Sequence, residues 1–432
     1  VGPLRAPPHP VVVTHPEGVN FTVTGNEVRW QNWRFRVEPH PREGPVLHLV
    51  RYRDGERERK VLHRLSLSEM VVPYGDPDDT WSWRSAFDVG EYGFGANANP
   101  LDAGSDVPSD AVFLPSVYVE PSGKAKENPR ALAIYERDGG VLWKHFNPEL
   151  RRNESRRAIE LVVAFGVTVE NYDYLLNYVF KQDGSMKVEA VLTGIMLAKG
   201  VPAPKAPHAG HPDAHEQYGH VVAPGVVAVH HQHFFNFRLD FDVDGPRNSL
   251  LELNSLPIPQ GAANPTGNAF SMRMDPLADE ASAQRDMSLA QARRWLIINP
   301  EQHNALGHPT GYALVPAENA VPYASPDNVS RKRAGFIDHP FWATRYAPQE
   351  LYAAGTYPNQ SEGGAGLPTW VRDNQPLVHE DLVVWYTLGV THTPRPEEWP
   401  VMPAAHAGFS LLPVGFFAKN PALDVPRSAP SP

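Results

Sequence analysis

The sequence contains no cysteine among its 432 residues. This absence excludes disulfide bonds, thiolate catalysis and cysteine-ligated zinc or iron–sulfur sites. Any metal ion would therefore be bound by histidine, aspartate, glutamate or backbone oxygen. Long hydrophobic runs are also missing: no stretch of about 18 apolar residues occurs, so we expect no membrane-spanning segment.

Blocks of like charge are absent as well. Lys and Arg total 39 against 49 for Asp and Glu, which gives a formal net charge of −10 without a basic stripe or an acidic tail. We therefore expect no nucleic-acid partner. The chain begins with Val-Gly-Pro, without Met or a signal peptide, so we expect a processed product or a fragment. The sequence specifies no compartment, and the lack of cysteine and signal peptide would fit a cytoplasmic one.

The residues that are abundant indicate strands. Forty-five prolines and 33 glycines punctuate short alternating segments, while helical periodicity is scarce. This pattern predicts an all-β fold, a large antiparallel β-sandwich forming one domain over residues 1–432. Residues 200–225 are predicted to form a functional loop or arm, and 421–432 a loosely held tail. Strands are expected within residues 21–30, 60–74, 141–146, 158–169, 172–197, 230–243, 293–300 and 381–392.

The segment 230–243 reads as a strand with two histidines on one face. Side chains alternate across a strand, so His231 and His233 share their face with the apolar residues Phe235, Phe237 and Leu239. A His-X-His pair suits a single metal ion, because both imidazoles leave the same face. For an isolated pair, two hydrogen-bonded core histidines remain the commoner explanation.

A third histidine ends the segment 381–392. His392 closes an apolar face, and Asp381 opens the opposite face. If this strand runs antiparallel beside 231–242, the register that sets His392 opposite His231 also sets Asp381 opposite Asp242. We therefore predict two separate metal sites on one strand pair, with a capping His and a solvated Asp as the alternative.

One carboxylate lies in strongly aromatic sequence. Asp88 is surrounded by Trp81, Trp83, Phe87 and other aromatic residues. Desolvation there would raise its pKa towards the range that a general base needs. A structural role is the commoner explanation for a lone aspartate of this kind.

The stretch TVENYDY, residues 168–174, opens a predicted hairpin with a polar step. Thr-X-X-Asn-Tyr-Asp/Glu-Tyr is the cofactor signature of the topaquinone-dependent copper-containing primary-amine oxidases, which this chain strongly resembles. Further matches are the His-Gln-His block, VVPYGDP, FDVGEYGFG and the closing THTPRPEEWPVMP and GFFAKNP. The similarity extends from about residue 3 to about residue 425.

The resemblance implies a set of site residues. Tyr172 would be oxidised in place to topaquinone by bound Cu(II) and O₂, with Asn171 restraining the ring. Asp88 would be the catalytic base, and Tyr74 would hydrogen-bond a quinone oxygen. The copper ligands implied are His231, His233 and His392. A second, calcium-type site would use Asp240, Asp242, Asp381 and the carbonyls of Phe241 and Leu382.

The activity implied is oxidative deamination of a small primary amine to an aldehyde, NH₃ and H₂O₂ with O₂. A homodimer held by the 200–225 arm is implied too, and we expect the small N-terminal domains of relatives to be missing from this sequence. Ala86 stands where many relatives carry an aromatic gate, which predicts a wider channel. The alternatives are a His-ligated metal oxygenase on a β-sandwich with Tyr172 unmodified, or a non-catalytic binding or structural relative.

Overall fold

The computed structural model describes residues 2–9, 15–120, 122–202 and 217–427. Almost all regular structure in these ranges is antiparallel β-strand, which confirms the predicted all-β class. The helices are short: α1 spans Val329–Arg333 and α2 spans Leu367–Trp370. Short 3₁₀ turns cover Gly335–Asp338, Val371–Asp373, Pro396–Glu398 and Pro421–Asp424.

One large sheet has the strand order β1-β2-β3-β4-β5-β15-β21-β20, with β6 pairing to β5. Its strands are β1 (Phe21–Thr24), β2 (Glu27–Trp30), β3 (Trp33–His40), β4 (Gly44–Asp54), β5 (Arg57–Pro73), β6 (Ser85–Phe87), β15 (His231–Phe241), β20 (Phe341–Arg345) and β21 (Leu382–His392).

The second large sheet has the order β17-β16-β18-β19-β22-β11-β10-β9-β8-β7, and a small third sheet has the order β12-β14-β13. The strands of the second sheet are β7 (Val112–Val119), β8 (Ala125–Asn147), β9 (Arg152–Val169), β10 (Tyr172–Lys181), β11 (Met186–Gly194), β16 (Ser249–Pro257), β17 (Phe270–Pro276), β18 (Arg294–His303), β19 (Pro309–Pro316) and β22 (Met402–Val414). The third sheet contains β12 (Ala198–Gly200), β13 (Gly219–Ala223) and β14 (Val226–Val229).

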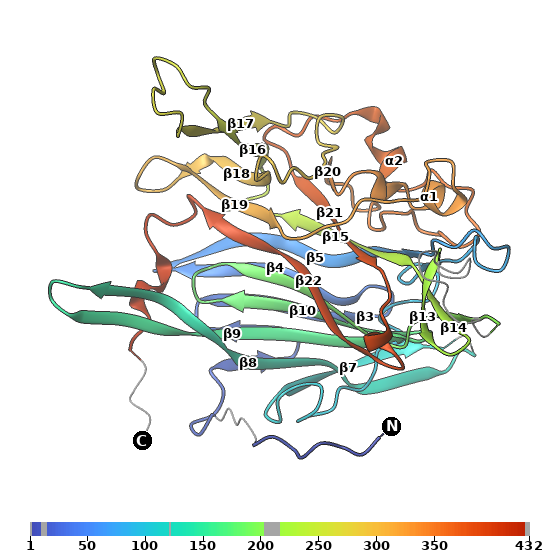
Figure 1. The fold of residues 1–432 in the computed structure, drawn as a ribbon. Helices are drawn as coiled ribbons and strands as arrows, with labels where there is room; N and C mark the ends of the chain where they lie inside the picture. The colour runs from blue at the N-terminus through green and yellow to red at the C-terminus, as the bar shows by residue number, and fades with distance from the viewer. Residues whose placement is uncertain (1, 10–14, 121, 203–216, 428–432) are drawn as a thin grey trace.

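The two large sheets lie one above the other and form the predicted sandwich (Figure 1). Their facing side chains make one continuous buried cluster that joins, for example, Phe237 of β15 to Phe409 of β22. Burial of this apolar area is the main stabilising contribution in a fold of this size. The far ends of β8 and β9 extend as a hairpin beyond the neighbouring strands.

The central strands β15 and β21 are buried on both faces, which strand periodicity alone did not indicate. The segment 329–373, which includes α1 and α2, covers the outer face with Phe336, Ile337 and other apolar residues. The polar residues of β15 on that face therefore pair internally. Asn236 donates to the Thr387 hydroxyl at 3.0 Å, and Arg238 to Asp240 at 3.2 Å.

The hairpin predicted within 172–197 is present. β10 pairs antiparallel with β11, from Tyr172 opposite Gly194 to Phe180 opposite Met186. The predicted turn lies at Asp183 and Gly184, where Gly184 has φ of 80° and Asp183 accepts a hydrogen bond from the Ser185 amide. The positive φ explains why glycine is used there.

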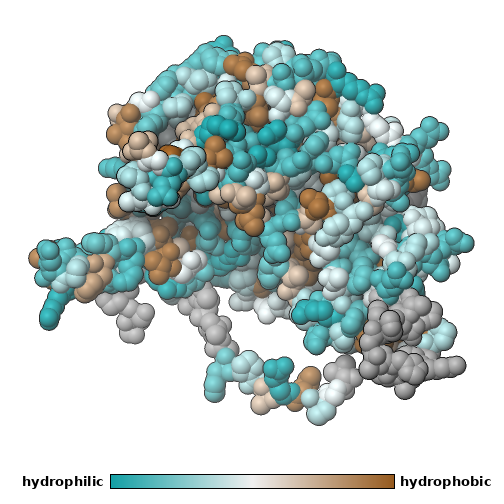
Figure 2. All heavy atoms as spheres, turned by 45° about the horizontal axis from the view of Figure 1, so that its top comes forward, coloured by the Kyte–Doolittle hydropathy of each residue, from teal (hydrophilic) through white to brown (hydrophobic). Residues whose placement is uncertain are grey.

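Most of the predicted 200–225 arm, residues 203–216, and the end of the predicted tail, residues 428–432, lie outside the described residues. On the face shown in Figure 2, hydrophobic residues are scattered among hydrophilic ones. None of the described helices has the length and apolar character needed to cross a bilayer.

Candidate metal centre and active site

Strand ends from both large sheets bring the predicted site residues to one end of the sandwich. β15 begins at His231, and its two antiparallel neighbours β5 and β21 end beside it. His231 pairs directly with His392 across the β15–β21 ladder, and Tyr74, just after β5, forms a bridge to His231. The antiparallel register predicted for the two strands is confirmed.

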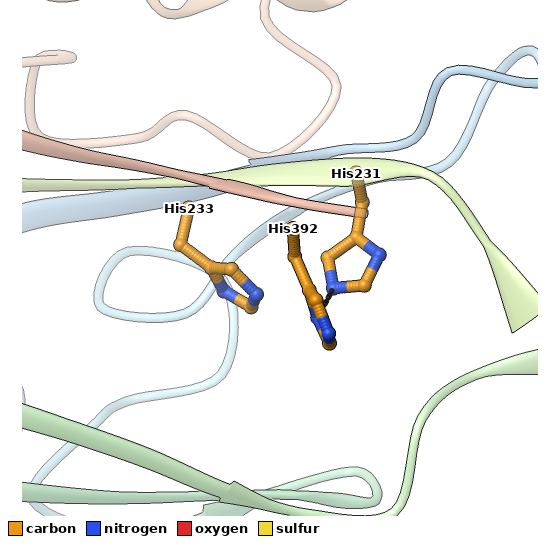
Figure 3. Close-up of side chains that lie close together, drawn as sticks. All are labelled: His231, His233 and His392. Carbon is orange, nitrogen blue, oxygen red and sulfur yellow. Dashed lines mark hydrogen bonds between the residues drawn. The ribbon is translucent and has the colours of Figure 1, made fainter. Parts of the chain in front are cut away.

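The three histidines form a compact cluster. Their rings project from β15 and β21 to the same side of the sheet (Figure 3). One nitrogen from each of His231, His233 and His392 lies within 4.8 Å of the others. Among the described residues, no other group of three or more His, Asp or Glu side chains converges in this way.

The chemistry of this cluster fits a copper ion. Burial, with the nearby His392, lowers the pKa of His231 to about 3. Burial also lowers the pKa of His233 well below its usual range, and the Nε2 atom of His233 is buried without a hydrogen-bond partner among the described residues. Neutral imidazole is the ligating form, and three imidazoles without thiolate suit Cu(II).

Tyr172 lies directly beside this cluster. It is the first residue of β10, buried at 4% exposure, and its hydroxyl is 2.8 Å from Nε2 of His231. Its ring centroid is 5.3 Å from that of His233. Burial raises the pKa of the Tyr172 phenol above its ordinary value. The opposite sheet therefore delivers this side chain to the three-histidine cluster.

Tyr74 and Asn171 flank Tyr172. The Tyr74 ring lies 5.0 Å from the ring of His231, which also contacts the Tyr172 hydroxyl. Burial raises the pKa of Tyr74 above its ordinary value, so this group is a neutral donor at physiological pH. The Asn171 amide donates to the Ile195 carbonyl, which ties the chain beside Tyr172 to the loop after β11.

Asp88 is a buried carboxyl group at the end of β6. Its residue is 2% exposed, its amide donates to the Met70 carbonyl at 3.1 Å, and Oδ1 has no hydrogen-bond partner among the described residues. Burial raises the pKa of Asp88 well above its usual range, and the charge of Glu69 raises it further. These are the properties expected of a general base.

Glu69 is a site residue that the sequence analysis missed. Its carboxylate is buried and accepts hydrogen bonds from the amides of Met70 and Gly90, so it fixes the turn that carries Asp88. Burial raises the pKa of Glu69 to about 7. A glutamate inside the apolar run LSLSEMVV of β5 was the signal available in the sequence.

Glu398 and Tyr174 were missed as well. Glu398 lies 3.0 Å from Nε2 of His392 and so orients that ring, while the Tyr174 hydroxyl lies 3.1 Å from Nδ1 of His233. Partners of this kind fix the ring orientation of metal-ligating histidines. Glu398 lies in a proline-rich turn, where a glutamate gives no sign of a contact with a histidine. Tyr174 was interpreted only as part of the 168–174 motif.

The predicted second site lies at the other end of the same strands. β15 ends at Phe241 and β21 begins at Leu382. Burial raises the pKa of Asp381 to about 6, with further contributions from the charges of Asp240 and Asp242, so the three acids are neighbours. Asp240 pairs with Arg238, and Asp242 lies 2.9 Å from Nζ of Lys60. The carboxylates approach one another without converging as the histidines do.

A cavity of about 660 Å³ opens beside the tyrosines. Tyr74 and Ala86 are on its wall, and Ala86 lies two residues before Asp88 on β6. Tyr172 itself does not line the cavity, but its chain neighbour Glu170 and the flanking Tyr74 do. Its other lining residues include the charged groups Arg84, Glu91, Glu170 and Arg333.

Comparison with known proteins finds one family along almost the whole chain. The family model described as copper amine oxidase, enzyme domain, matches residues 22–431. A histamine oxidase of Arthrobacter globiformis is 43% identical over 428 residues, 99% of this chain and 61% of that protein. A primary amine oxidase of Klebsiella aerogenes is 38% identical over 96% of this chain and 55% of that protein.

The solved structure of a copper-containing benzylamine oxidase from Hansenula polymorpha superimposes with a TM-score of 0.92. It is 35% identical, and the alignment covers 99% of this chain and 66% of that one. The chain thus spans between about half and two thirds of the length of these relatives.

Proposed function

The chain belongs to the copper amine oxidase family, over the enzyme domain, and on this premise we propose that it deaminates primary amines oxidatively. A primary amine, O₂ and water would give an aldehyde, NH₃ and H₂O₂. A metal oxygenase or a non-catalytic relative is not favoured, because Tyr172 lies against the three histidines and Asp88 is retained.

One observation carries the proposal. The Tyr172 hydroxyl lies 2.8 Å from a nitrogen of His231, inside a cluster of three histidines with converging nitrogens. A tyrosine in ordinary core packing needs a hydrogen-bond partner but not three imidazoles. This arrangement supports Tyr172 as a precursor that is oxidised beside a metal.

We assign the cofactors as follows. His231, His233 and His392 would hold copper, with Glu398 fixing the orientation of His392. Copper supplies the O₂-dependent oxidation of Tyr172 to topaquinone, and topaquinone supplies the carbonyl and electron-accepting ring for amine oxidation.

Side chains of this protein would bind the amine, remove its α-proton and hold the ring of residue 172. The cavity lined by Tyr74 and Ala86 would admit the amine. Asp88 removes the α-proton of the bound amine, because its carboxyl group is buried, has a raised pKa and keeps one oxygen free. The resemblance assigns Tyr74 as the residue that would hydrogen-bond a quinone oxygen at position 172, and Asn171 as the residue that would restrain rotation of the ring there.

Two further assignments rest on the resemblance. A calcium-type ion would bind Asp240, Asp242, Asp381 and the carbonyls of Phe241 and Leu382, since hard oxygen ligands suit Ca²⁺. The protein would act as a homodimer, with an arm formed by residues 200–225. A cytoplasmic location stays a proposal; among the relatives, the diamine oxidase of Nicotiana tabacum is peroxisomal by name.

Copper-dependent modification of Tyr172 tests the function. Metal-free protein given Cu(II) in air should develop a visible quinone absorbance, and the peptide spanning Tyr172 should gain two oxygen atoms and lose two hydrogen atoms. Samples without copper or without oxygen, and the Tyr172→Phe variant, serve as controls. Plain tyrosine in copper-loaded, active protein would refute the assignment.

A further inference from the structure

Glu170 occupies a backbone position that favours glycine. It is the first residue of the two-residue loop between β9 and β10, because Val169 pairs with Tyr172. Its φ is 55°, whereas Asn171 is not among the residues with positive φ. This is the pattern of a type II′ hairpin turn, whose first position prefers glycine because a Cβ atom is strained there. Strain held beside a reacting residue suggests a functional reason for the side chain.

Glu170 lines the same cavity as Tyr74 and Ala86. Oε1 accepts a hydrogen bond of 2.8 Å from the Tyr92 hydroxyl, which is on the same wall. The charge of Glu170 also contributes to the raised pKa values of Asp88 and Tyr74, so the carboxylate is close to the reacting groups. A strained side chain therefore places negative charge beside the path of the amine.

The other charged groups on this wall are already engaged. Glu91 and Arg333 form an ion pair with each other. The Arg84 guanidinium donates to the Thr80 carbonyl at 3.1 Å and lies over the rings of Trp81 and Trp83. Within the described part of the chain, no cationic side chain forms an ion pair with Glu170. A cationic group on the substrate could take that position.

We propose that Glu170 is a specificity-determining residue that binds the second ammonium group of an alkyl diamine while the first reaches residue 172. The proposal rests on the function proposed above. Only Asn171 separates Glu170 from Tyr172 in this turn, so the substrate to which the proposal applies is a short alkyl diamine such as 1,4-diaminobutane. Both amines of such a molecule are charged at neutral pH, since alkylammonium pKa values are about 10.

The test compares two substrates of matched length, 1,4-diaminobutane and 1-aminopentane, with the copper-loaded enzyme. In Glu170→Gln, the ratio of kcat/KM for the diamine to that for the monoamine should fall about threefold to fivefold, the size of a partly exposed ion pair. Any change in the pKa of Asp88 acts on both substrates and cancels in the ratio. Glu170→Gly, which also removes the strain, should show the same fall.

Two matched variants separate charge from structure. Tyr92→Phe removes the hydrogen bond and keeps the carboxylate, so the ratio should change much less than in Glu170→Gln. Arg84→Gln removes the opposing charge and should raise the ratio. The wild-type ratio should also fall as salt is added, because partly exposed charges are screened. An unchanged ratio in Glu170→Gln, or an equal fall in Tyr92→Phe, would overturn the proposal.

A binding measurement separates this proposal from the proposed function. Calorimetry with 1,4-diaminobutane on metal-free protein should give weaker binding for Glu170→Gln than for the wild type, whether or not turnover occurs. Equal affinities would overturn the diamine proposal and leave the oxidase function standing if 1-aminopentane is oxidised. Absence of any amine oxidation by copper-loaded protein would contradict the function and not the binding site.

Discussion

At the scale of single residues, the proposed chemistry depends on the protonation of two buried carboxyl groups, Asp88 and Glu69. Both have raised pKa values because burial removes them from water, and the charge of Glu69 raises the pKa of Asp88 further. The charges of Glu170 and Glu91 make smaller contributions that also raise the pKa of Asp88. Arg42, with Nη2 3.8 Å from Glu69, lowers the pKa of Glu69 and so partly offsets the effect of its burial.

Asp88→Asn should assemble the quinone and then fail to oxidise amine. The amide has the same shape, so folding and copper binding persist, but it cannot accept the α-proton. Loss of a general base is expected to slow amine-dependent bleaching of the quinone by about 10²- to 10⁴-fold. Stopped-flow absorbance measures this rate, and bleaching at the wild-type rate would remove Asp88 from the mechanism.

Glu69→Gln should move the acid limb of kcat/KM to lower pH. The base is active when deprotonated, so activity rises as pH rises through the pKa of Asp88. Replacing Glu69 with neutral glutamine removes the largest charge that opposes ionisation of Asp88, and that pKa therefore falls. Glu91→Gln is the matched control, because it removes a smaller charge at Asp88 and should move the acid limb less. An unmoved limb would contradict the coupling.

The same substitution should change how stability depends on pH. The pKa of Glu69 rises from 4.5 to about 7 on folding, so the native state binds more protons than the unfolded state between these values. The free energy of unfolding contributed by this group is thus fully present below pH ~4.5 and is lost as pH rises through ~7. Urea unfolding of Glu69→Gln should lack this part of the decline.

At the scale of elements, the β15–β21 pair carries both predicted metal sites. The ladder runs in one register from His231 opposite His392 to Asp240 opposite Val383. Eleven residues at about 3.4 Å place the two ends up to ~37 Å apart. An ion at the carboxylate end cannot take part in chemistry at the histidines, and we expect it to hold the register of the strands that carry them.

Asp242→Ala should therefore lower calcium affinity and the melting temperature while an assembled copper–quinone site stays active. Calcium titration, thermal unfolding and amine oxidation are the three measurements. Lys60→Met is the matched control, since it removes the 2.9 Å ion pair with Asp242 and keeps the carboxylate. If calcium raises the melting temperature of Asp242→Ala as much as that of the wild type, the second site is elsewhere or absent.

At the scale of the whole molecule, one edge of the second sheet carries exposed apolar side chains. Phe270, Met272 and Met274 alternate along the edge strand β17 on one face and are exposed by 70%, 53% and 56%. Exposed apolar edge strands favour pairing or burial against another chain. Light scattering at micromolar concentration should give the mass of a dimer, and a monomer there would contradict the homodimer.

Local sequence patterns alone determined the fold class and several site residues of this protein. Side chains alternate along any strand, so the shared face of His231 and His233 followed without knowledge of the fold. The same alternation, with turn residues such as Asp183-Gly184, predicted the all-β class and the 172–197 hairpin. The 168–174 motif identified the tyrosine because its residues are contiguous in the chain.

Only the tertiary structure decided which distant residues meet. His231 and His392 are 161 positions apart, and the sequence could suggest their register but not that β15 lies between β5 and β21. The burial of β15 on both faces, and the placing of Glu69 and Glu170 beside Asp88 and the cavity, depend on the packing of separate segments. Such contacts arise from the free energy of the whole core, which no local periodicity records.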